Sequence, residues 1–253
     1  MMKSPAWLMF ALAVLPINQA AAEETVEDVT VRVDRATTDR TDFYDSRYSL
    51  DDVFEKATNN HGEGFEALYG TRNFRTILNG VAYRGGANNK YHREARRDNM
   101  NPLPVEGLVN LCQEGFERSY YLYRTNFESA PKVTRCISPS GKEHRLDYRQ
   151  VSPFDEVHRR QMLGDVFETI RDESRGPVYL HCWNGWHASG LISAYILRQF
   201  CGYSADDAVA YWDANTDGHN TEPRYESIRR RIRQFEPYPE FAIEPDEAAR
   251  ICP

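Results

Sequence analysis

The segment that most constrains the fold of this chain runs from residue 178 to residue 200. It begins with the short apolar run V-Y-L, continues through a glycine-containing turn, and ends in residues 189–200, which are apolar on nearly every side of a helix. A short apolar run between turn signals is typical of a buried strand, and a helix that is hydrophobic all round lies in the middle of a core. The segment therefore predicts a strand, a tight turn and a central helix.

The preceding residues predict further strands. Short apolar runs at residues 81–83 and 108–111 are bounded by glycine and charge, which favours buried strands. A turn signal at 138–141 separates two extended stretches, 132–137 and 144–151. Interleaved with helices, these strands predict an α/β fold with a central, mainly parallel sheet flanked by helices.

Helix signals frame this sheet. A cap residue, a proline and an acid at residues 152–155 predict a helix from 153 to about 174. Gly202 ends the central helix, residues 204–207 cap the next one, and apolar spacing over 225–235 marks a last helix. We expect the folded domain to span residues 76–240, followed by a C-terminal tail at 241–253.

Residues 23–75 are expected to form an N-terminal accessory segment of the same molecule. Valines alternate with polar residues over 25–34, which predicts a strand, and the charged stretch 34–45 predicts a loop. A capping-box variant at 49–52 predicts a short helix through Ala57.

Residues 1–22 are typical of a cleaved secretory signal peptide. Lys3 precedes an apolar run, and the small residues at 20–22 form an A-x-A pattern before Glu23. A membrane anchor needs about 20 consecutive apolar residues, whereas this run is interrupted by Pro16 and Asn18. We therefore expect a secreted or periplasmic protein without a membrane span.

Composition excludes several classes of protein. Of 253 residues, 41% are hydrophobic and 12% aromatic, which is enough for a core and excludes collagen-like, mucin-like, coiled-coil and disordered chains. The formal net charge is −7, and removal of the signal peptide with Lys3 makes it one unit more negative. This balance argues against a nucleic-acid partner, because non-specific binding to nucleic acids depends on a positive field.

Cys182 lies at the bend of the predicted strand, turn and helix, whose residues 178–190 read V-Y-L-H-C-W-N-G-W-H-A-S-G. Backbone N–H groups and a helix N-terminus converge at such a bend and favour an anion there. The same field favours the thiolate form of Cys182, which is the better nucleophile. A buried cysteine at such a turn can equally be an inert packing residue, so local features leave both interpretations open.

The pattern H-C-x-x-G-x-x-x-S-G at residues 181–190 resembles the P-loop of the protein tyrosine and dual-specificity phosphatase superfamily. That loop reads His-Cys, five residues, Arg, and Ser or Thr, usually followed by Gly, and this chain looks most like the atypical dual-specificity group. The segments Y-R-G-G at 83–86 and V-N-L at 109–111 resemble upstream landmarks of the family, and Asp155 lies where its general acid is found. The resemblance covers roughly residues 80–235 and implies the phosphatase fold.

The resemblance also implies a role for each matching residue. Cys182 would be the nucleophile that takes the phosphoryl group, His181 would orient its thiolate, and Ser189 would hydrogen-bond it. Asp155 would protonate the leaving group and then activate water, although it also fits as a helix-capping residue. The residues implied in substrate binding are Trp183, Asn184, Gly185, Trp186, His187, Ala188 and Arg84. No cofactor is implied.

The sequence departs from the family at two cations of the loop. The family arginine falls on Ala188, and the lysine of the most similar subgroup falls on Trp186. That arginine grips two phosphate oxygens in a bidentate pair. Loss of one preorganised donor of this kind typically lowers the rate by about 10² to 10³.

Three interpretations of this departure remain open. An active phosphatase could replace the missing charge with His187, Arg84 or the arginines at 229–231, although that cluster also fits a solvated helix face. A pseudophosphatase could keep the anion pocket for binding without turnover. Alternatively, Cys182 could attack a less anionic group stacked on Trp183 or Trp186, although both tryptophans also fit as packing residues.

The resemblance favours an exported cysteine-dependent phosphatase, with the non-catalytic binding protein as its alternative. The expected partner is a phosphorylated small molecule or a phosphoprotein, and a phosphopeptide, an inositol phosphate and a small phosphate monoester remain open as substrates. The sequence does not fix the oligomeric state.

Two further features concern cysteine and metal chemistry. Export permits disulfides, and five cysteines leave at least one thiol unpaired within the chain. Because the P-loop motif requires a thiolate at Cys182, we expect Cys112 to pair with Cys136 and Cys201 with Cys252, although spacing alone does not fix the connectivity. Residues 213–218 match the first half of a calcium loop, but Arg224 occupies the position of its bidentate glutamate. A helix-ending turn is therefore preferred, and no metal site is predicted.

Overall fold

The computed structural model describes residues 39–68, 71–87 and 102–253. The chain divides into two units, Met1–Thr38 and Asp39–Pro253, and every described residue belongs to the second. The predicted signal peptide and the strand predicted at 25–34 lie outside the described residues.

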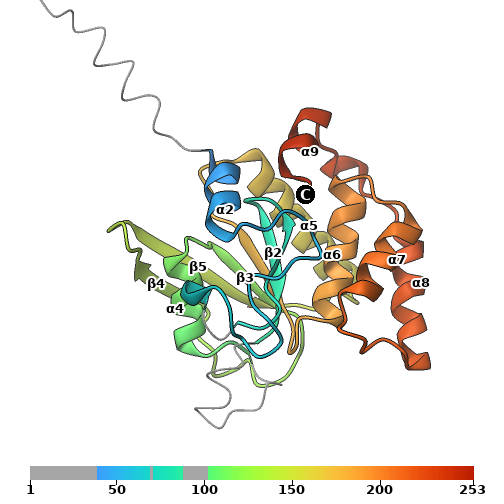
Figure 1. Ribbon diagram of the computed structural model, residues 1–253, viewed down its shortest axis with the longest axis horizontal. Helices are drawn as coiled ribbons and strands as arrows, with labels where there is room; N and C mark the ends of the chain where they lie inside the picture. The colour runs from blue at the N-terminus through green and yellow to red at the C-terminus, as the bar shows by residue number, and fades with distance from the viewer. Residues whose placement is uncertain (1–38, 69–70, 88–101) are drawn as a thin grey trace, which may run out of the picture. The chain divides into compact units, whose positions relative to one another are not determined.

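The second unit is built on one mixed sheet with the strand order β1-β2-β6-β3-β5-β4 (Figure 1). Strands β2, β6, β3 and β5 run parallel to one another, and the edge strands β1 and β4 are antiparallel to their neighbours. The strands are β1 (Arg75–Leu78), β2 (Ala82–Gly85), β3 (Arg118–Tyr121), β4 (Val133–Ile137), β5 (Glu143–Gln150) and β6 (Val178–His181). The predicted α/β fold with a mainly parallel central sheet is confirmed.

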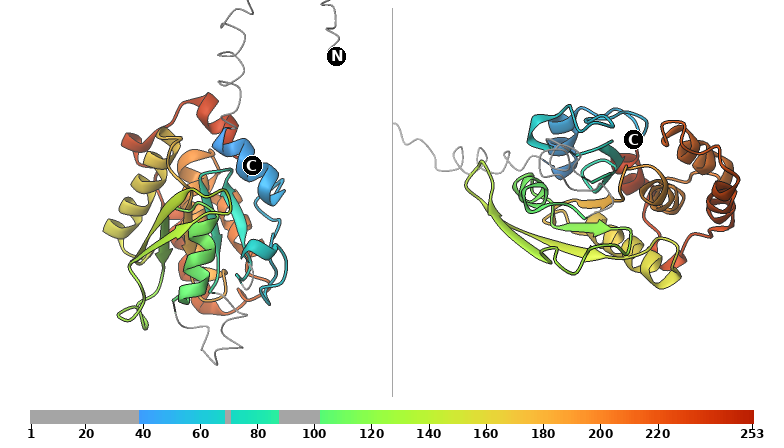
Figure 2. Two further views of the ribbon diagram at one scale, coloured as in Figure 1. Left: turned by 90° about the vertical axis from the view of Figure 1, so that its left-hand side faces the viewer. Right: turned by 90° about the horizontal axis from the view of Figure 1, so that it is seen from below.

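Helices cover both faces of this sheet (Figure 2). The helices are α2 (Arg40–Tyr48), α4 (Val105–Gln113), α5 (Glu156–Arg171), α6 (His187–Phe200), α7 (Ala205–Ala214), α8 (Glu226–Gln234) and α9 (Pro245–Ile251), with short 3₁₀ turns at Glu66–Leu68, Pro223–Tyr225 and Pro239–Phe241. Because successive side chains of β6 point to opposite faces of the sheet, the strand contributes to two hydrophobic clusters. Val178 and Leu180 pack with α5 to α9, whereas Tyr179 packs with α2 and α4.

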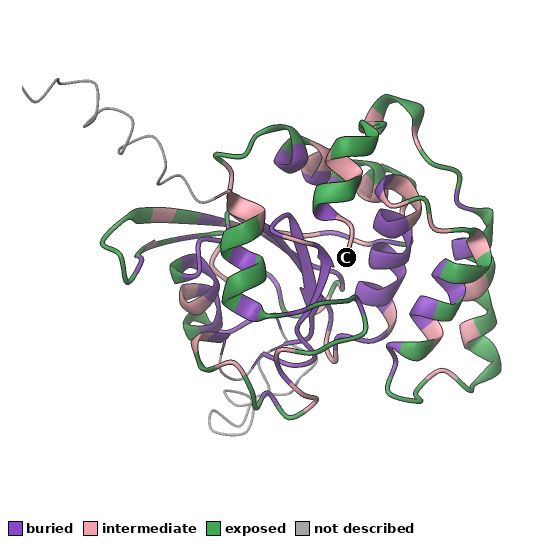
Figure 3. Cartoon of the chain, turned by 45° about the horizontal axis from the view of Figure 1, so that its top comes forward, coloured by how far each residue is buried: buried purple, intermediate pink, exposed green. Residues whose placement is uncertain are grey.

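The apolar helix predicted at 189–200 is α6, at the centre of the larger cluster. It lies against β1, β2 and β6 on one side and against α7 and α8 on the other. Its residues are therefore almost all buried, as Figure 3 shows. This surrounding explains why the segment lacks a polar face.

The strand predicted at residues 108–111 is wrong, because these residues lie in α4. Leu108, Leu111 and Cys112 are buried at helical spacing and pack into the cluster that contains Tyr179. A short apolar run does not by itself distinguish a buried strand from one face of a helix. The neighbouring strand of the sheet is instead β3, which was not predicted.

The loop predicted at 34–45 is also wrong, because α2 begins at Arg40. The Asp39 carboxylate accepts a hydrogen bond from the Thr41 N–H at 2.9 Å and so caps the helix. Tyr44 and Tyr48 lie one turn apart and are both buried. Their packing outweighs the charged, loop-like composition of the segment.

The helix predicted from residue 49 to Ala57 is a series of turns. Ser49 ends α2 in the left-handed conformation, with φ of 49°. The Asp52 carboxylate, which was predicted to complete a capping box, accepts hydrogen bonds from the N–H groups of Phe54 and Glu55. This is a local turn and does not start a helix.

The C-terminal half follows the sequence predictions closely. β4 and β5 form the predicted hairpin, and β6, α6, α7 and α8 lie where strands and helices were expected. Helix α5 begins at Glu156, later than the predicted residue 153, because Asp155 is its capping residue. The predicted tail at 241–253 contains the additional helix α9.

The two predicted disulfides are confirmed. Cys112 of α4 is bonded to Cys136 of β4, and Cys201 after α6 is bonded to Cys252 after α9. Cys182 is free and buried. In the part of the chain that the structure describes, no helix has both the length and the apolar character needed to cross a membrane.

Candidate active site

Cys182 directly follows β6 and begins the loop that leads into α6. Its Sγ lies 3.3 Å from the Ser189 Oγ in the first turn of α6, and both residues are buried. The Cys182 N–H donates to the Gly85 carbonyl of β2, which fixes the start of the loop against the sheet. The thiol and the hydroxyl are thus brought together as the sequence predicts.

The carbonyl groups of the loop are hydrogen-bonded on the side that faces the protein interior. The Trp183 carbonyl accepts a hydrogen bond from the Ala87 N–H at 2.9 Å, and the Asn184 carbonyl accepts one from the Asn73 side-chain amide at 2.8 Å. The carbonyls of Gly185 and Trp186 both accept from the Arg84 guanidinium. The Trp186 carbonyl also accepts from the Gly190 N–H of α6 at 3.1 Å, whereas the other donors are buried residues behind the loop.

This arrangement orients the loop as an anion cradle. A trans peptide carries its N–H group opposite its carbonyl. The N–H groups of Asn184, Trp186 and His187 are therefore directed away from the interior side of the loop. Helix α6 begins at His187 without a side-chain cap, and its N-terminus adds partial positive charge on the same side. The loop can therefore bind an anion beside the Cys182 thiol.

Two glycines allow the loop to lie this close to β2. A Cβ atom on Gly86 would lie 2.6 Å from the Asn184 carbonyl carbon. Gly185 has a φ of +77°, which side chains disfavour, and a Cβ there would lie 2.8 Å from the Gly85 carbonyl carbon. The glycines at both positions are therefore required by close backbone packing.

His181 supports the loop from behind. It is fully buried, its Nδ1 lies 3.2 Å from the Cys182 carbonyl oxygen, and its Nε2 lies 2.8 Å from the Tyr148 hydroxyl. Burial lowers the pKa of His181 to about 3, so the imidazole is neutral at physiological pH. Because a carbonyl only accepts, Nδ1 carries the proton and Nε2 accepts from Tyr148.

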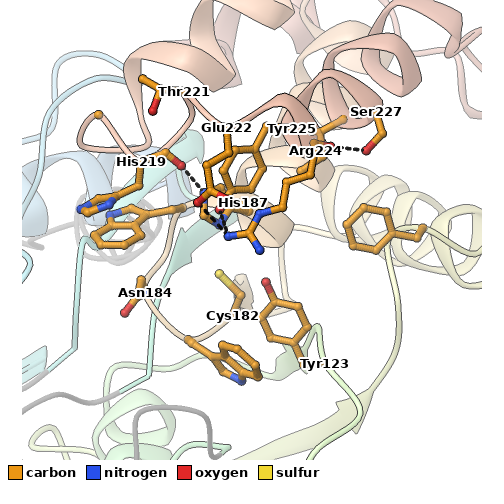
Figure 4. A pocket seen from close by; sticks show the side chains of 15 residues that line it. Tyr123, Cys182, Asn184, His187, His219, Thr221, Glu222, Arg224, Tyr225 and Ser227 are labelled. Atoms are coloured by element: carbon orange, nitrogen blue, oxygen red, sulfur yellow. Dashed lines mark hydrogen bonds and ion pairs between the residues drawn. The ribbon is translucent and has the colours of Figure 1, made fainter.

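A pocket of about 680 Å³ opens over Cys182 (Figure 4). Three aromatic pairs form much of its wall, with ring centroids 4.4 Å apart for Tyr123 and Trp183, 3.9 Å for Trp186 and His219, and 4.3 Å for His187 and Tyr225. The lining residues are Tyr123, Phe154, Cys182, Trp183, Asn184, Trp186, His187, Gly218, His219, Thr221, Glu222, Arg224, Tyr225, Ser227 and Ile228.

Four of the predicted substrate-binding residues line this pocket: Trp183, Asn184, Trp186 and His187. The Trp186 indole donates to the Asp217 carboxylate at 3.1 Å, which fixes the ring at the pocket wall. Burial lowers the pKa of His187, and its Nε2 lies 2.5 Å from the His219 carbonyl oxygen. His187 is thus a neutral donor and does not replace the missing positive charge.

The structure does not place Arg84 or Ala188 in the pocket. Arg84 is fully buried, and besides the two loop carbonyls its guanidinium donates to the Tyr211 hydroxyl at 2.9 Å. Ala188 is buried in the hydrophobic core at the start of α6. Arg84 therefore shapes the loop from behind, and its predicted role in substrate binding is not supported.

Asp155 caps helix α5. Its carboxylate accepts a hydrogen bond from the His158 N–H at 3.0 Å as the cap of α5. This bond and the charge of His158 lower the pKa of Asp155, whereas a general acid must hold its proton. Its neighbour Phe154 lines the pocket, but Asp155 is not among the described residues that do so.

The arginines at 229–231 do not supply a pocket cation either. Arg229 is paired with Asp213 at 2.6 Å, and the exposed Arg230 and Arg231 lie on α8. The pocket-lining arginine is instead Arg224, which sequence reasoning missed. Nothing in its local sequence marks it, because α7 and the following connection bring it to Cys182 only in the folded chain.

The segment that resembles a calcium loop forms a helix-ending turn, as preferred from the sequence. Helix α7 ends at Ala214, and Asp217 and Gly218 have positive φ. Asp213 is engaged by Arg229, and Asp217 by Lys56 and the Trp186 indole. Across residues 39–68, 71–87 and 102–253, no group of three or more His, Cys, Asp or Glu side chains could hold a metal ion.

Comparison with solved structures finds several tyrosine and dual-specificity phosphatases. The chain is similar to Tk-PTP in its active form, with 14% identity over 64% of this chain and 96% of that one and a TM-score of 0.40. Similarity to TpbA of P. aeruginosa covers 62% and 81% of the two chains at 14% identity and a TM-score of 0.39. For a mouse putative dual specificity phosphatase complexed with zinc tungstate, the corresponding values are 64%, 86%, 14% and 0.40. Protein-family models and curated proteins gave no match.

Proposed function

We propose that this chain is an exported cysteine-dependent phosphatase that hydrolyses a phosphate monoester through a phosphocysteine at Cys182. The observation that supports this most directly is the free Cys182 thiol, which lines a pocket and lies beside Ser189 at the start of the loop. The disulfides pair the other four cysteines and leave this thiol available.

The reaction divides into two transfers at phosphorus. The Cys182 thiolate attacks the phosphorus, an S–P bond forms, and the P–O bond to the leaving group breaks with its electron pair on the leaving oxygen, which takes a proton from a carboxyl group. Water then attacks the phosphorus and gives a proton to the same carboxylate, and the S–P bond breaks to release inorganic phosphate and the thiolate. Ser189 donates a hydrogen bond to the departing thiolate.

We assign the proton-donating carboxyl group to Glu222. Within the described chain, it is the only carboxylate that lines the pocket, and its side chain is 58% exposed. Asp155 was the sequence-based choice, but it serves as the cap of α5. The assignment therefore moves from the start of α5 to the connection between α7 and α8.

The lining of the pocket favours a substrate with one phosphate group attached to a planar, aromatic group. Aromatic rings of Tyr123, Trp183, Trp186 and Tyr225 surround the thiol, and such rings bind planar groups by stacking. Among the described lining residues, Arg224 alone is a lysine or arginine. An inositol polyphosphate would require several cations, so an aryl phosphate or a phosphotyrosine peptide is the better candidate.

A pseudophosphatase that binds an anion or a partner is the second candidate. The observation that favours it is the side chain of residue 188, which is a methyl group buried in the core. No cation reaches the cradle from α6 itself, because the loop residues 183–188 include neither lysine nor arginine. Such a site could bind phosphate and still turn over too slowly to act as an enzyme.

The decisive experiment is phosphate release from an aryl phosphate, a phosphotyrosine peptide and phytate. We expect turnover of the first two by the wild-type protein and a loss of at least about 10³-fold in Cys182→Ser, since the nucleophile is removed. Ser193→Ala is a matched control, because Ser193 is a buried hydroxyl on α6 that donates to the Ser189 carbonyl and does not line the described pocket. Wild-type turnover no faster than that of Cys182→Ser would contradict the enzyme and favour the binding protein.

A further inference from the structure

The loop over Cys182 contains no lysine or arginine, and the buried Arg84 and Arg72 behind it donate to groups of the protein. Arg84 donates to the carbonyls of Gly185 and Trp186 and to Tyr211. Arg72 donates to the backbone and side chain of Asn60. A phosphate dianion bound by backbone N–H groups alone would therefore lack the paired donors that stabilise its charge.

Arg224 lies on the open side of the same pocket. It belongs to the 3₁₀ turn Pro223–Tyr225 in the connection between α7 and α8. Figure 4 shows its guanidinium above Cys182, between His187 and Tyr123. The stacking of Tyr225 on His187 and the burial of Ile228 anchor this turn beside the start of α6.

The guanidinium is held in place but remains accessible. Nη2 donates to the Glu222 carboxylate at 2.9 Å and to the Tyr225 hydroxyl at 3.1 Å, and the side chain is 68% exposed. Both bonds use Nη2, and over the described residues Nε and Nη1 have no hydrogen-bond partner. Because each bidentate edge of a guanidinium includes Nη2, a phosphate that binds in this way displaces Glu222 from that nitrogen. An exposed ion pair contributes little to stability, so a phosphate dianion can compete with Glu222.

The charge of Arg224 acts across the whole pocket. Burial lowers the pKa of His187, and Arg224 lowers it further. Burial raises the pKa of Tyr123 on the opposite wall, and Arg224 opposes that rise. Both effects agree with the position of the guanidinium in Figure 4, above the thiol and between these two residues.

We propose that Arg224 supplies from the α7–α8 connection the phosphate-binding cation that the loop lacks at residue 188. This inference rests on the proposed function, because it assigns the bidentate donor of the same phosphoryl transfer. The guanidinium contacts two non-bridging oxygens of the phosphate through Nε and Nη2, and the phosphate displaces the Glu222 carboxylate from Nη2. Binding draws Arg224 away from Glu222, which leaves that carboxyl group able to exchange a proton with the leaving oxygen.

The test compares Arg224→Ala and Arg224→Lys with a matched control. Arg230→Ala removes the same charge from an exposed position on α8 that does not line the described pocket. With an aryl phosphate, we expect kcat/KM to fall by about 10² to 10³ in Arg224→Ala. Arg224→Lys should recover part of this loss, because ammonium keeps the charge without the planar fork, and Arg230→Ala should remain within about twofold of wild type.

A binding measurement separates this inference from the proposed function. The affinity for inorganic phosphate is measured by calorimetry in the Cys182→Ser background, with Arg224→Ala or Arg230→Ala added. We expect at least about a tenfold loss of affinity for Arg224→Ala, since a charged hydrogen bond contributes roughly 1.5 to 3 kcal/mol, and little change for Arg230→Ala.

The two readouts fail in different ways. Equal phosphate affinity of the two double variants would overturn the assignment of Arg224, even if Cys182-dependent turnover is observed. A tenfold affinity loss specific to Arg224, in a protein whose turnover does not depend on Cys182, would support the cation and overturn the enzyme. Equal melting temperatures of the variants would show that the losses do not come from unfolding.

Discussion

Arg84 and Arg224 both lie beside the 182–188 loop, but they differ in burial and in the groups to which they donate. Arg84 lies behind the loop, is fully buried, and donates to two loop carbonyls and a tyrosine hydroxyl. Arg224 lies in front of the loop, is 68% exposed, and is held by one carboxylate and one tyrosine hydroxyl. The first is a fixed part of the fold, and the second is available to a ligand.

An anion site needs fixed N–H donors and a positive charge, and the two arginines serve these needs separately. The interior residues Arg84 and Asn73 hold the loop carbonyls on the interior side and thereby direct the N–H groups toward the pocket. Such preorganised donors need no rearrangement when the anion binds. The transferred phosphoryl group changes position during the reaction. A cation that stays in contact with it is better provided by an exposed side chain such as Arg224.

The largest expected effect is the loss of stability in Arg84→Met. Methionine retains most of the volume but leaves the Gly185 and Trp186 carbonyls and the Tyr211 hydroxyl without their charged donor. Since each such bond contributes roughly 1.5 to 3 kcal/mol, we expect the free energy of unfolding to fall by about 4 kcal/mol in urea denaturation. Arg224→Ala should change it by less than about 0.5 kcal/mol, and similar losses for both variants would abolish the contrast between the two sides.

The buried His181 behind the loop makes the stability of the fold depend on pH. His181 stacks among Tyr121, Tyr148 and Tyr179 behind the loop, and burial lowers its pKa to about 3. The unfolded chain, with an ordinary histidine pKa of about 6.5, binds a proton that the folded chain excludes. Folded-state stability should therefore decrease as the pH falls from about 6.5 toward 3, by about 1.4 kcal/mol per pH unit from this residue.

Urea denaturation of wild type and His181→Gln between pH 7 and pH 4 checks this expectation. Glutamine does not titrate, so the variant should lose stability less steeply than wild type, by the contribution of His181. All other titrating groups are common to both proteins, and the difference in slope isolates the one residue. Parallel curves would show that His181 is protonated in the fold.

The residues around Cys182 could be predicted from sequence because they follow one another along the chain. A strand, a glycine turn and a helix bring Cys182 and Ser189 together by local geometry alone, and the P-loop resemblance draws on the same segment. The motif also required Cys182 to stay free, and it is free in the structure. The confirmed pairing of the other four cysteines was one of three that this requirement allows, so the sequence did not determine it.

The cation of the site could not be predicted in this way. Sequence reasoning singled out Arg84, which does lie beside the loop, but the direction of its guanidinium depends on how β2 and α6 pack. Arg224 reaches the pocket through the connection between α7 and α8, a contact that no periodicity or spacing encodes. The helix that contains residues 108–111 was missed because its short apolar run fits both a buried strand and one face of a helix.

The remaining predictions compare two carboxylates, Asp155 and Glu222, and the smaller effect is expected at Asp155. Asp155→Asn keeps a side chain that caps helices well, so stability should stay within about 0.5 kcal/mol of wild type, whereas Asp155→Ala should lose about 1 kcal/mol. Because Asp155 lies outside the described pocket lining, we expect Asp155→Asn to change kcat for an alkyl phosphate by less than about twofold, within the range of a surface substitution.

Glu222→Gln should instead lower kcat for the alkyl ester by about 10², the lower end of the range for general acid catalysis. Its effect on an aryl ester should be smaller, because a phenolate leaves without full protonation. The same variant should bind inorganic phosphate more tightly, since it removes the carboxylate that competes for Arg224. A loss of alkyl phosphate turnover in Asp155→Asn at unchanged stability would return the acid to the start of α5, and would mean that the cap opens when substrate binds.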